Sequence, residues 1–133
     1  MFLALTLGGA CAHTKKNANT ENLRPTVESF HQRVRWKDFR VASGHIVPER
    51  RQDFERALRE SEAERDLNIT DYEIESVEMV EEGQRAIVTS TIRWTRLPSV
   101  SEQKAAVTSE FVFRNGTWLL ERQLGGPFDG VLP

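Results

Sequence analysis

Hydrophobic residues first recur at helical spacing after position 24. Several apolar side chains fall on one stripe of a helix, and Pro25 can occupy its first turn, where the missing N–H costs nothing. This pattern predicts a first helix from about Pro25 to Phe39. The residues that share the apolar stripe are Val27, Phe30, Val34 and Val41.

A second helical pattern follows a short interruption. The segment "SGHIVP" at residues 43–48 breaks the first pattern, and Pro48 can open a helix that runs to about Arg65. The run "ERRQDFERALRESEAER" places opposite charges four residues apart, which is typical of a helix on a solvated surface. The expected ion pairs are Arg51 with Glu55, Glu55 with Arg59, and Arg56 with Glu60, beside a narrow apolar face of Phe54, Ala57 and Leu58.

From Ile69 onward the hydrophobic period changes to two, which predicts strands. In the first strand, Tyr72 and Ile74 alternate in one phase and Val77 and Met79 in the other, so we expect a slip in the middle. The segment "EEGQ" at residues 81–84 is a turn. A strong hairpin signal follows later at Asn115-Gly116, because both positions tolerate positive φ.

Three further strands share one apolar face. The expected inward positions of the second strand are Ala86, Val88, Ser90, Ile92 and Trp94. Those of the third are Ala105, Val107, Ser109, Phe111 and Phe113, and Trp118 and Leu120 continue in a fourth. The order predicts an α+β fold in which two N-terminal helices pack on a curved, four-stranded antiparallel sheet.

The element order, with the segments "QRAIVTSTIRW" and "EFVFRNGTWLL", resembles the nuclear transport factor two-like superfamily of cystatin-like α+β rolls. The resemblance covers about residues 25–123 and implies the cone-shaped roll shared with ketosteroid isomerase and scytalone dehydratase. Its members include dehydratases, isomerases, epoxide hydrolases, transport adaptors and assembly subunits of envelope secretion systems. The resemblance therefore implies a scaffold without fixing an activity.

Composition narrows the classes of partner. A chain of 133 residues fits one domain, and 18 basic against 20 acidic residues give a net charge of −2. No large positive field favours nucleic acid, so we predict no nucleic-acid partner. The single cysteine, Cys11, excludes an internal disulfide. Residues 124–133 form a tail too rich in Gly and Pro to extend the sheet.

The N-terminal residues predict where in the cell the protein is located. Residues 1–10 carry no charge, and this apolar run is far shorter than the ~20 residues that span a bilayer. The small residues before Cys11 are typical of a cleaved export signal. The sequence Leu7-Gly8-Gly9-Ala10-Cys11 resembles a bacterial lipobox, which implies a signal peptide over 1–10, diacylglycerol and palmitate on Cys11, and a polar tether over residues 11–24.

The residue after the cysteine predicts the membrane to which the protein is sorted. By resemblance to enterobacterial sorting, Ala12 implies the outer membrane, with the domain facing the periplasm. Two alternatives remain open. Cleavage after Ala12 would release a soluble periplasmic or secreted protein, because Ala10-Cys11-Ala12 satisfies the small-x-small rule. In the other alternative, the apolar start is an ordinary N-terminal helix or strand and Cys11 is a small buried hydrophobe.

The expected inward sheet positions offer no general base. None is a carboxylate or a histidine, and Glu110 falls on the outward parity. The first helix does carry candidate acid–base residues, since His31 and Asp38 are two helical turns apart near the apolar stripe. With Tyr72 they are candidate catalytic residues at a pocket mouth. No spacing of His, Cys and carboxylates matches a metal site, so we predict no metal and no cofactor.

Two functions follow from these patterns. The first is a non-catalytic envelope lipoprotein, held to the membrane through lipidated Cys11, whose roll binds an unknown protein partner or acts in assembly. The second is a small-molecule dehydratase-like or isomerase-like enzyme, or a carrier, that uses His31, Asp38 and Tyr72. The outward sheet face predicts a weak homodimer, through the apolar residues Ile87, Leu97, Val112 and Leu119.

Overall fold

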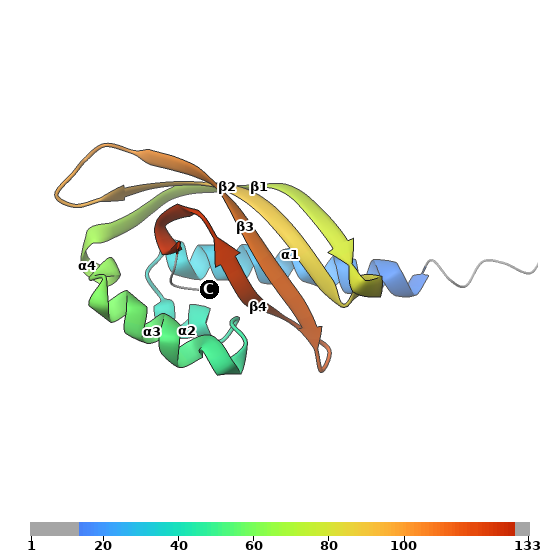
Figure 1. Ribbon diagram of the computed structural model, residues 1–133. Helices are drawn as coiled ribbons and strands as arrows, with labels where there is room; N and C mark the ends of the chain where they lie inside the picture. The colour runs from blue at the N-terminus through green and yellow to red at the C-terminus, as the bar shows by residue number, and fades with distance from the viewer. Residues whose placement is uncertain (1–13, 130–133) are drawn as a thin grey trace, which may run out of the picture.

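The computed structural model describes residues 14–129, with side chains from Glu21 onward. The fold is α+β: the helices precede an antiparallel sheet of four strands in the order β1-β2-β3-β4. Figure 1 shows the sheet curving over α1, with α2 and α3 on the same side. The helices are α1 (Thr14–Arg35), α2 (Phe39–Ser43), α3 (Arg51–Glu60) and α4 (Ala63–Asp66). The strands are β1 (Leu67–Val80), β2 (Arg85–Arg96), β3 (Gln103–Arg114) and β4 (Thr117–Leu124).

Helix α1 begins earlier than the hydrophobic pattern predicts. It starts at Thr14 rather than Pro25, so the described part of the expected tether is helical, and Leu23 is only 1% exposed. Leu23 is the one large aliphatic residue between positions 14 and 24, and a single residue cannot display a period.

Helix α1 also ends before the predicted position, at Arg35 rather than Phe39. Lys37 takes a left-handed conformation, with φ of 62°. The N–H of Lys37 donates to Val34 O at 3.0 Å, and the N–H of Asp38 donates to Arg33 O at 2.8 Å. This is the Schellman arrangement, which usually places glycine where Lys37 stands. No glycine therefore marks the end of this helix in the sequence.

The predicted second helix is divided into three parts. A 3₁₀ turn, η1 (Pro48–Arg50), leads into α3, and α4 follows a break at Glu62, whose φ is 55°. None of the three expected i,i+4 ion pairs forms between the described side chains. Arg51 instead donates to Ile46 O at 2.9 Å and to Gly44 O at 3.3 Å, so the loop takes the donors that Glu55 would have met.

The sheet follows the predicted alternation. The register of β1 slips between Ile69 and Asp71 and between Ile74 and Ser76; the second slip is the predicted one, and it brings Val77 opposite Val88. The turn at residues 81–83 is the 3₁₀ turn η2 (Glu81–Gly83). Asn115 and Gly116 have φ of 51° and 77° and form the predicted hairpin. The inner face is buried at Ala86, Val88, Ser90, Ile92, Val107, Ser109 and Phe111.

A bulge in β4 changes which residue faces the interior. Glu110 pairs with Arg122, but Phe111 pairs with Leu120, so Glu121 is an extra residue in β4. The phase shift turns Gln123 inward, where it is 1% exposed. Its side-chain amide donates to Ser109 Oγ at 3.0 Å. A buried polar pair thus occupies a position that simple alternation does not predict.

The chain after β4 folds back against the inner face. The 3₁₀ turn η3 (Gly126–Phe128) lies against β3, and a Cβ on Gly126 would stand 2.6 Å from Val107 Cγ2. Phe128 is 3% exposed, and its ring centroid lies 6.2 Å from that of Phe54 on α3. Phe128 therefore anchors the described part of the Gly/Pro-rich tail in the core and covers the inner face beside α3.

Candidate functional site

The structure brings two of the three predicted catalytic candidates together. His31 on α1 and Tyr72 on β1 stack with ring centroids 5.0 Å apart and an interplanar angle of 22°. Phe30 meets the His31 ring edge-on at 5.6 Å. His31 is 4% exposed, and its Nδ1 lies 2.8 Å from Val27 O. Because a carbonyl oxygen only accepts, Nδ1 carries the proton and Nε2 presents a lone pair.

The environment keeps His31 neutral. Burial lowers the pKa of the His31 ring, and the hydrogen bond to the Val27 carbonyl opposes this effect only in part. Among the described residues, Nε2 of His31 has no hydrogen-bond partner, and the same is true of the buried Ser90 hydroxyl. A neutral imidazole with a free lone pair is chemically competent as a hydrogen-bond acceptor or a base.

Tyr72 lies at the edge of this interior. Its hydroxyl donates weakly to Glu28 O at 3.5 Å. Burial raises the pKa of the Tyr72 phenol, and the nearby Glu28 carboxylate raises it further. Tyr72 therefore remains protonated at neutral pH and can only donate its hydroxyl proton or accept through the same oxygen.

Asp38 stays outside the pair. Helix α1 ends at Arg35, so Asp38 is no longer on the helical stripe that placed it near His31 in the sequence pattern. Its carboxylate lies 3.3 Å from Arg33 Nη1 and is partly exposed. The predicted lipidation residue, Cys11, lies outside the described residues.

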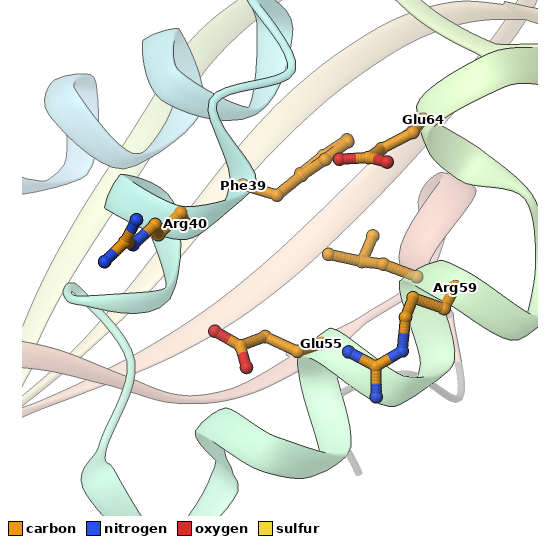
Figure 2. Close-up of a pocket in the computed structure, with 6 residues that line it drawn as sticks. Phe39, Arg40, Glu55, Arg59 and Glu64 are labelled. Carbon is orange, nitrogen blue, oxygen red and sulfur yellow. The ribbon is translucent and has the colours of Figure 1, made fainter.

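A second feature lies between the short helices. Residues of helices α2, α3 and α4 line an open groove with a volume of about 410 Å³. Its floor is apolar and its rim carries charges of both signs, as Figure 2 shows. The lining residues, defined here as the helix groove, are Phe39, Arg40, Glu55, Leu58, Arg59 and Glu64. The sequence does not predict this groove, because the break at Glu62 beside it contains no glycine or proline.

The side-chain charges of the helix groove lack partners within the described part of the chain. No ion pair or side-chain hydrogen bond joins Arg40, Glu55, Arg59 or Glu64 to any residue from 21 to 129. Neighbouring charges on the same helices are paired, since Arg56 reaches Asp53 at 3.5 Å and Arg65 reaches Asp66 at 2.9 Å. The rim can therefore offer its charges to a ligand.

Neither a metal site nor a membrane span appears in the region that the structure describes. No group of three or more His, Cys, Asp and Glu side chains within residues 14–129 is arranged to hold a metal ion. Over the same residues, no helix combines the length and the apolar character needed to cross a bilayer.

Comparison with known proteins gives the fold. No protein-family model matches the sequence, and neither does any curated protein. A SEC-C motif containing protein from Rhodopseudomonas palustris, solved in solution, is 21% identical with a TM-score of 0.63, and the match covers 76% of each chain. A protein described as a candidate polyketide cyclase, from Xanthomonas campestris, is 13% identical with a TM-score of 0.57, over 79% of this chain and 89% of the other. At these identities the likeness shows that the chain shares their fold, and nothing about its activity.

Proposed function

We propose that this protein is a bacterial cell-envelope lipoprotein whose α+β roll is a non-catalytic binding or assembly module. In this proposal Cys11 carries the lipid, the domain faces the periplasm from the outer membrane, and the cone-shaped roll presents a binding surface. The lipobox-like segment Leu7-Gly8-Gly9-Ala10-Cys11 supports the anchor. The described chain supports the binding role.

One observation carries the binding role: the inner face of the sheet is closed. Phe128 and α1 cover it, and its polar groups are the neutral side chains of Ser109, Gln123, Ser90 and His31. A substrate would have to displace a packed aromatic ring to reach this face. The helix groove, in contrast, is an open surface lined by charged side chains.

The lipid anchor is tested by the mass of the mature protein extracted from bacterial cells. We expect a chain that begins at Cys11 and carries the mass of diacylglycerol and an acyl group. A Cys11→Ala variant should lose this mass and appear in the soluble fraction, whereas Lys15→Ala, also within the expected tether, should retain it. A mature chain that begins at His13 without lipid would contradict the anchor and support the soluble alternative.

A second candidate function rests on the unpartnered Nε2 of His31. In this alternative the roll is a dehydratase-like or isomerase-like enzyme, or a carrier, in which His31 accepts a proton and Tyr72 donates a hydrogen bond. Deuterium exchange into a set of small enolisable ketones, followed by NMR, tests it. Exchange that falls at least tenfold in His31→Gln but not in Asp38→Asn would favour the enzyme. Exchange at the buffer rate with every ketone would argue against it.

We also propose a weak homodimer through the outward sheet face. Val112 on this face is 6% exposed, and Ile87 and Leu119 are half-buried among longer polar side chains. Leu97, which directly follows β2, is 46% exposed. Such a surface offers limited apolar area, so only weak association is expected. Sedimentation should show a concentration-dependent increase in mass that Leu119→Glu abolishes. A strict monomer at high concentration would contradict this proposal.

A further inference from the structure

We propose that the helix groove binds a zwitterionic amino acid, or a short peptide with the same groups, that bears an apolar side chain. This inference rests on the proposed binding role of the domain and does not depend on the lipid anchor. Three features of the groove support it: the shape of its floor, the balance of its charges and the absence of internal partners for them.

The floor suits one apolar side chain. Phe39 from α2 and Leu58 from α3 lie at the base of the groove and are 6% and 4% exposed. In Figure 2, the side chain of Phe39 projects from α2 toward Glu64 on α4. The volume of about 410 Å³ falls within the range of about 300–1,000 Å³ seen for small-molecule sites. An amino acid or a dipeptide fits this space.

The rim favours a ligand of zero net charge. Arg40 and Arg59 contribute two positive charges, and Glu55 and Glu64 contribute two negative ones. A fatty acid or a phosphate would gain from the arginines but would meet repulsion from the two carboxylates. A zwitterion can satisfy both signs, because its carboxylate accepts from a guanidinium while its ammonium group donates to a glutamate.

The local fold leaves these groups unoccupied. Arg51 donates to the Ile46 and Gly44 carbonyls and cannot also pair with Glu55. In Figure 2 the Glu55 carboxylate points toward the side of α2 and away from the Arg59 guanidinium. Lys37 contacts α4 through the backbone carbonyl of Glu64, at 2.9 Å, and leaves the Glu64 carboxylate unbonded. The groove thus holds four ionised groups beside an apolar floor, with none committed to another described residue.

Ligand-observed and methyl NMR on the whole chain tests this assignment with four probes: L-phenylalanine, N-acetyl-L-phenylalanine, phenethylamine and the dipeptide Leu-Phe. We expect L-phenylalanine to shift the Leu58 methyl signals. The two singly charged analogues should bind at least fivefold more weakly. Tighter binding of the dipeptide would identify a peptide as the ligand, and weaker binding would identify the free amino acid.

Matched variants of α3 separate charge recognition from simple apolar contact. Glu55→Gln and Arg59→Gln should each weaken L-phenylalanine binding at least fivefold. Arg56→Gln and Glu60→Gln, which lie on the same helix outside the groove, should leave binding unchanged. Equal binding of all three phenylalanine analogues, or no shift of Leu58 with any probe, would overturn the zwitterion site. Neither result would affect the anchor, which the mass of the mature chain tests separately.

Discussion

The inner face of the sheet and the helix groove both combine aromatic and polar side chains, but the two regions differ in the burial and charge of the polar ones. On the inner face, the polar side chains are neutral and buried: His31 is 4% exposed, and Ser90 and Ser109 are fully covered. In the groove, the polar side chains of Arg59 and Glu64 are exposed and charged. Only the second region presents groups that a ligand in water can reach without unpacking the core.

The difference follows from the cost of burying charge. An ionised group inside the sheet would need a partner and several hydrogen bonds, so the interior holds a neutral imidazole, hydroxyls and one amide. At the surface, solvent stabilises unpaired ions at little cost. Chemistry that requires charge is therefore expected at the helix groove, and chemistry that requires a neutral lone pair is expected beside His31.

The largest effect is expected from a substitution that opens the closed inner face of the sheet. Phe128→Ala removes a ring that is 3% exposed and packs on Phe54, so we expect a loss of about 3 kcal/mol in the free energy of unfolding. Chemical denaturation measures this loss. The control, Val100→Ala, alters a side chain that is 87% exposed and should change stability by less than about 0.5 kcal/mol. A loss below about 1 kcal/mol for Phe128→Ala would mean that this ring does not close the face.

Low pH is a second test of the inner face, because it favours the charged form of the buried His31. The pKa of His31 is lowered in the folded state, mainly by burial, so the unfolded chain binds more protons below the ordinary pKa of 6.5. Stability should fall as the pH decreases from 6.5 toward the folded-state pKa, by up to about 1.4 kcal/mol for each unit. The partly buried His45, whose pKa is also lowered, adds to this slope.

Denaturation at a series of pH values, with the variants His31→Phe and His45→Gln, resolves the two contributions. His31→Phe should flatten most of the dependence between pH 6.5 and pH 5, and His45→Gln should flatten less of it. A wild-type stability that is constant over this interval would show that folding does not lower the pKa of His31, which would contradict the effect of burial on this ring.

Much of the sheet could be predicted from the sequence, because burial of one face imposes a period of two. Ser90 and Ser109 were placed inward from alternation alone, and Asn115-Gly116 marked the hairpin. The bulge at Glu121 could not be predicted, since an extra residue in a strand leaves no mark in composition. That bulge is what turns Gln123 inward, so one buried member of the inner polar set was missed.

The helices were predicted less well, because their ends depend on backbone conformations that their residues do not signal. Lys37 and Glu62 adopt positive φ although neither is glycine or asparagine. The early end of α1 separates Asp38 from His31, and the break at Glu62 shapes the helix groove. His31 and Tyr72 were identified correctly as neighbours, because both lie in regular segments where spacing determines direction.

Substitution of two buried serines, Ser109 and Ser90, tests whether their hydroxyls form hydrogen bonds inside the sheet. Ser109→Ala leaves the buried amide of Gln123 without its acceptor, so we expect a loss of about 1–2 kcal/mol. Ser90→Ala removes a hydroxyl that has no partner among the described residues, so stability should stay constant or rise slightly. Denaturation of both variants gives the comparison directly. A large loss for Ser90→Ala would reveal that this hydroxyl is bonded in solution, for example to a buried water molecule.

The smallest expected effects on stability come from removing single charges. They compare the helix groove with the paired charges on the outer face of the sheet. There Glu121 accepts from Arg85 at 3.1 Å and from Arg114 at 3.4 Å, and its bond to Arg85 raises the pKa of that guanidinium. Glu121→Gln should therefore cost about 1 kcal/mol, because the partly buried Arg85 and the exposed Arg114 both lose an ionic partner. Glu55→Gln breaks no described bond and should change stability by less than about 0.5 kcal/mol. Equal losses in thermal denaturation would show that Glu55 has a structural partner and is not available to a ligand.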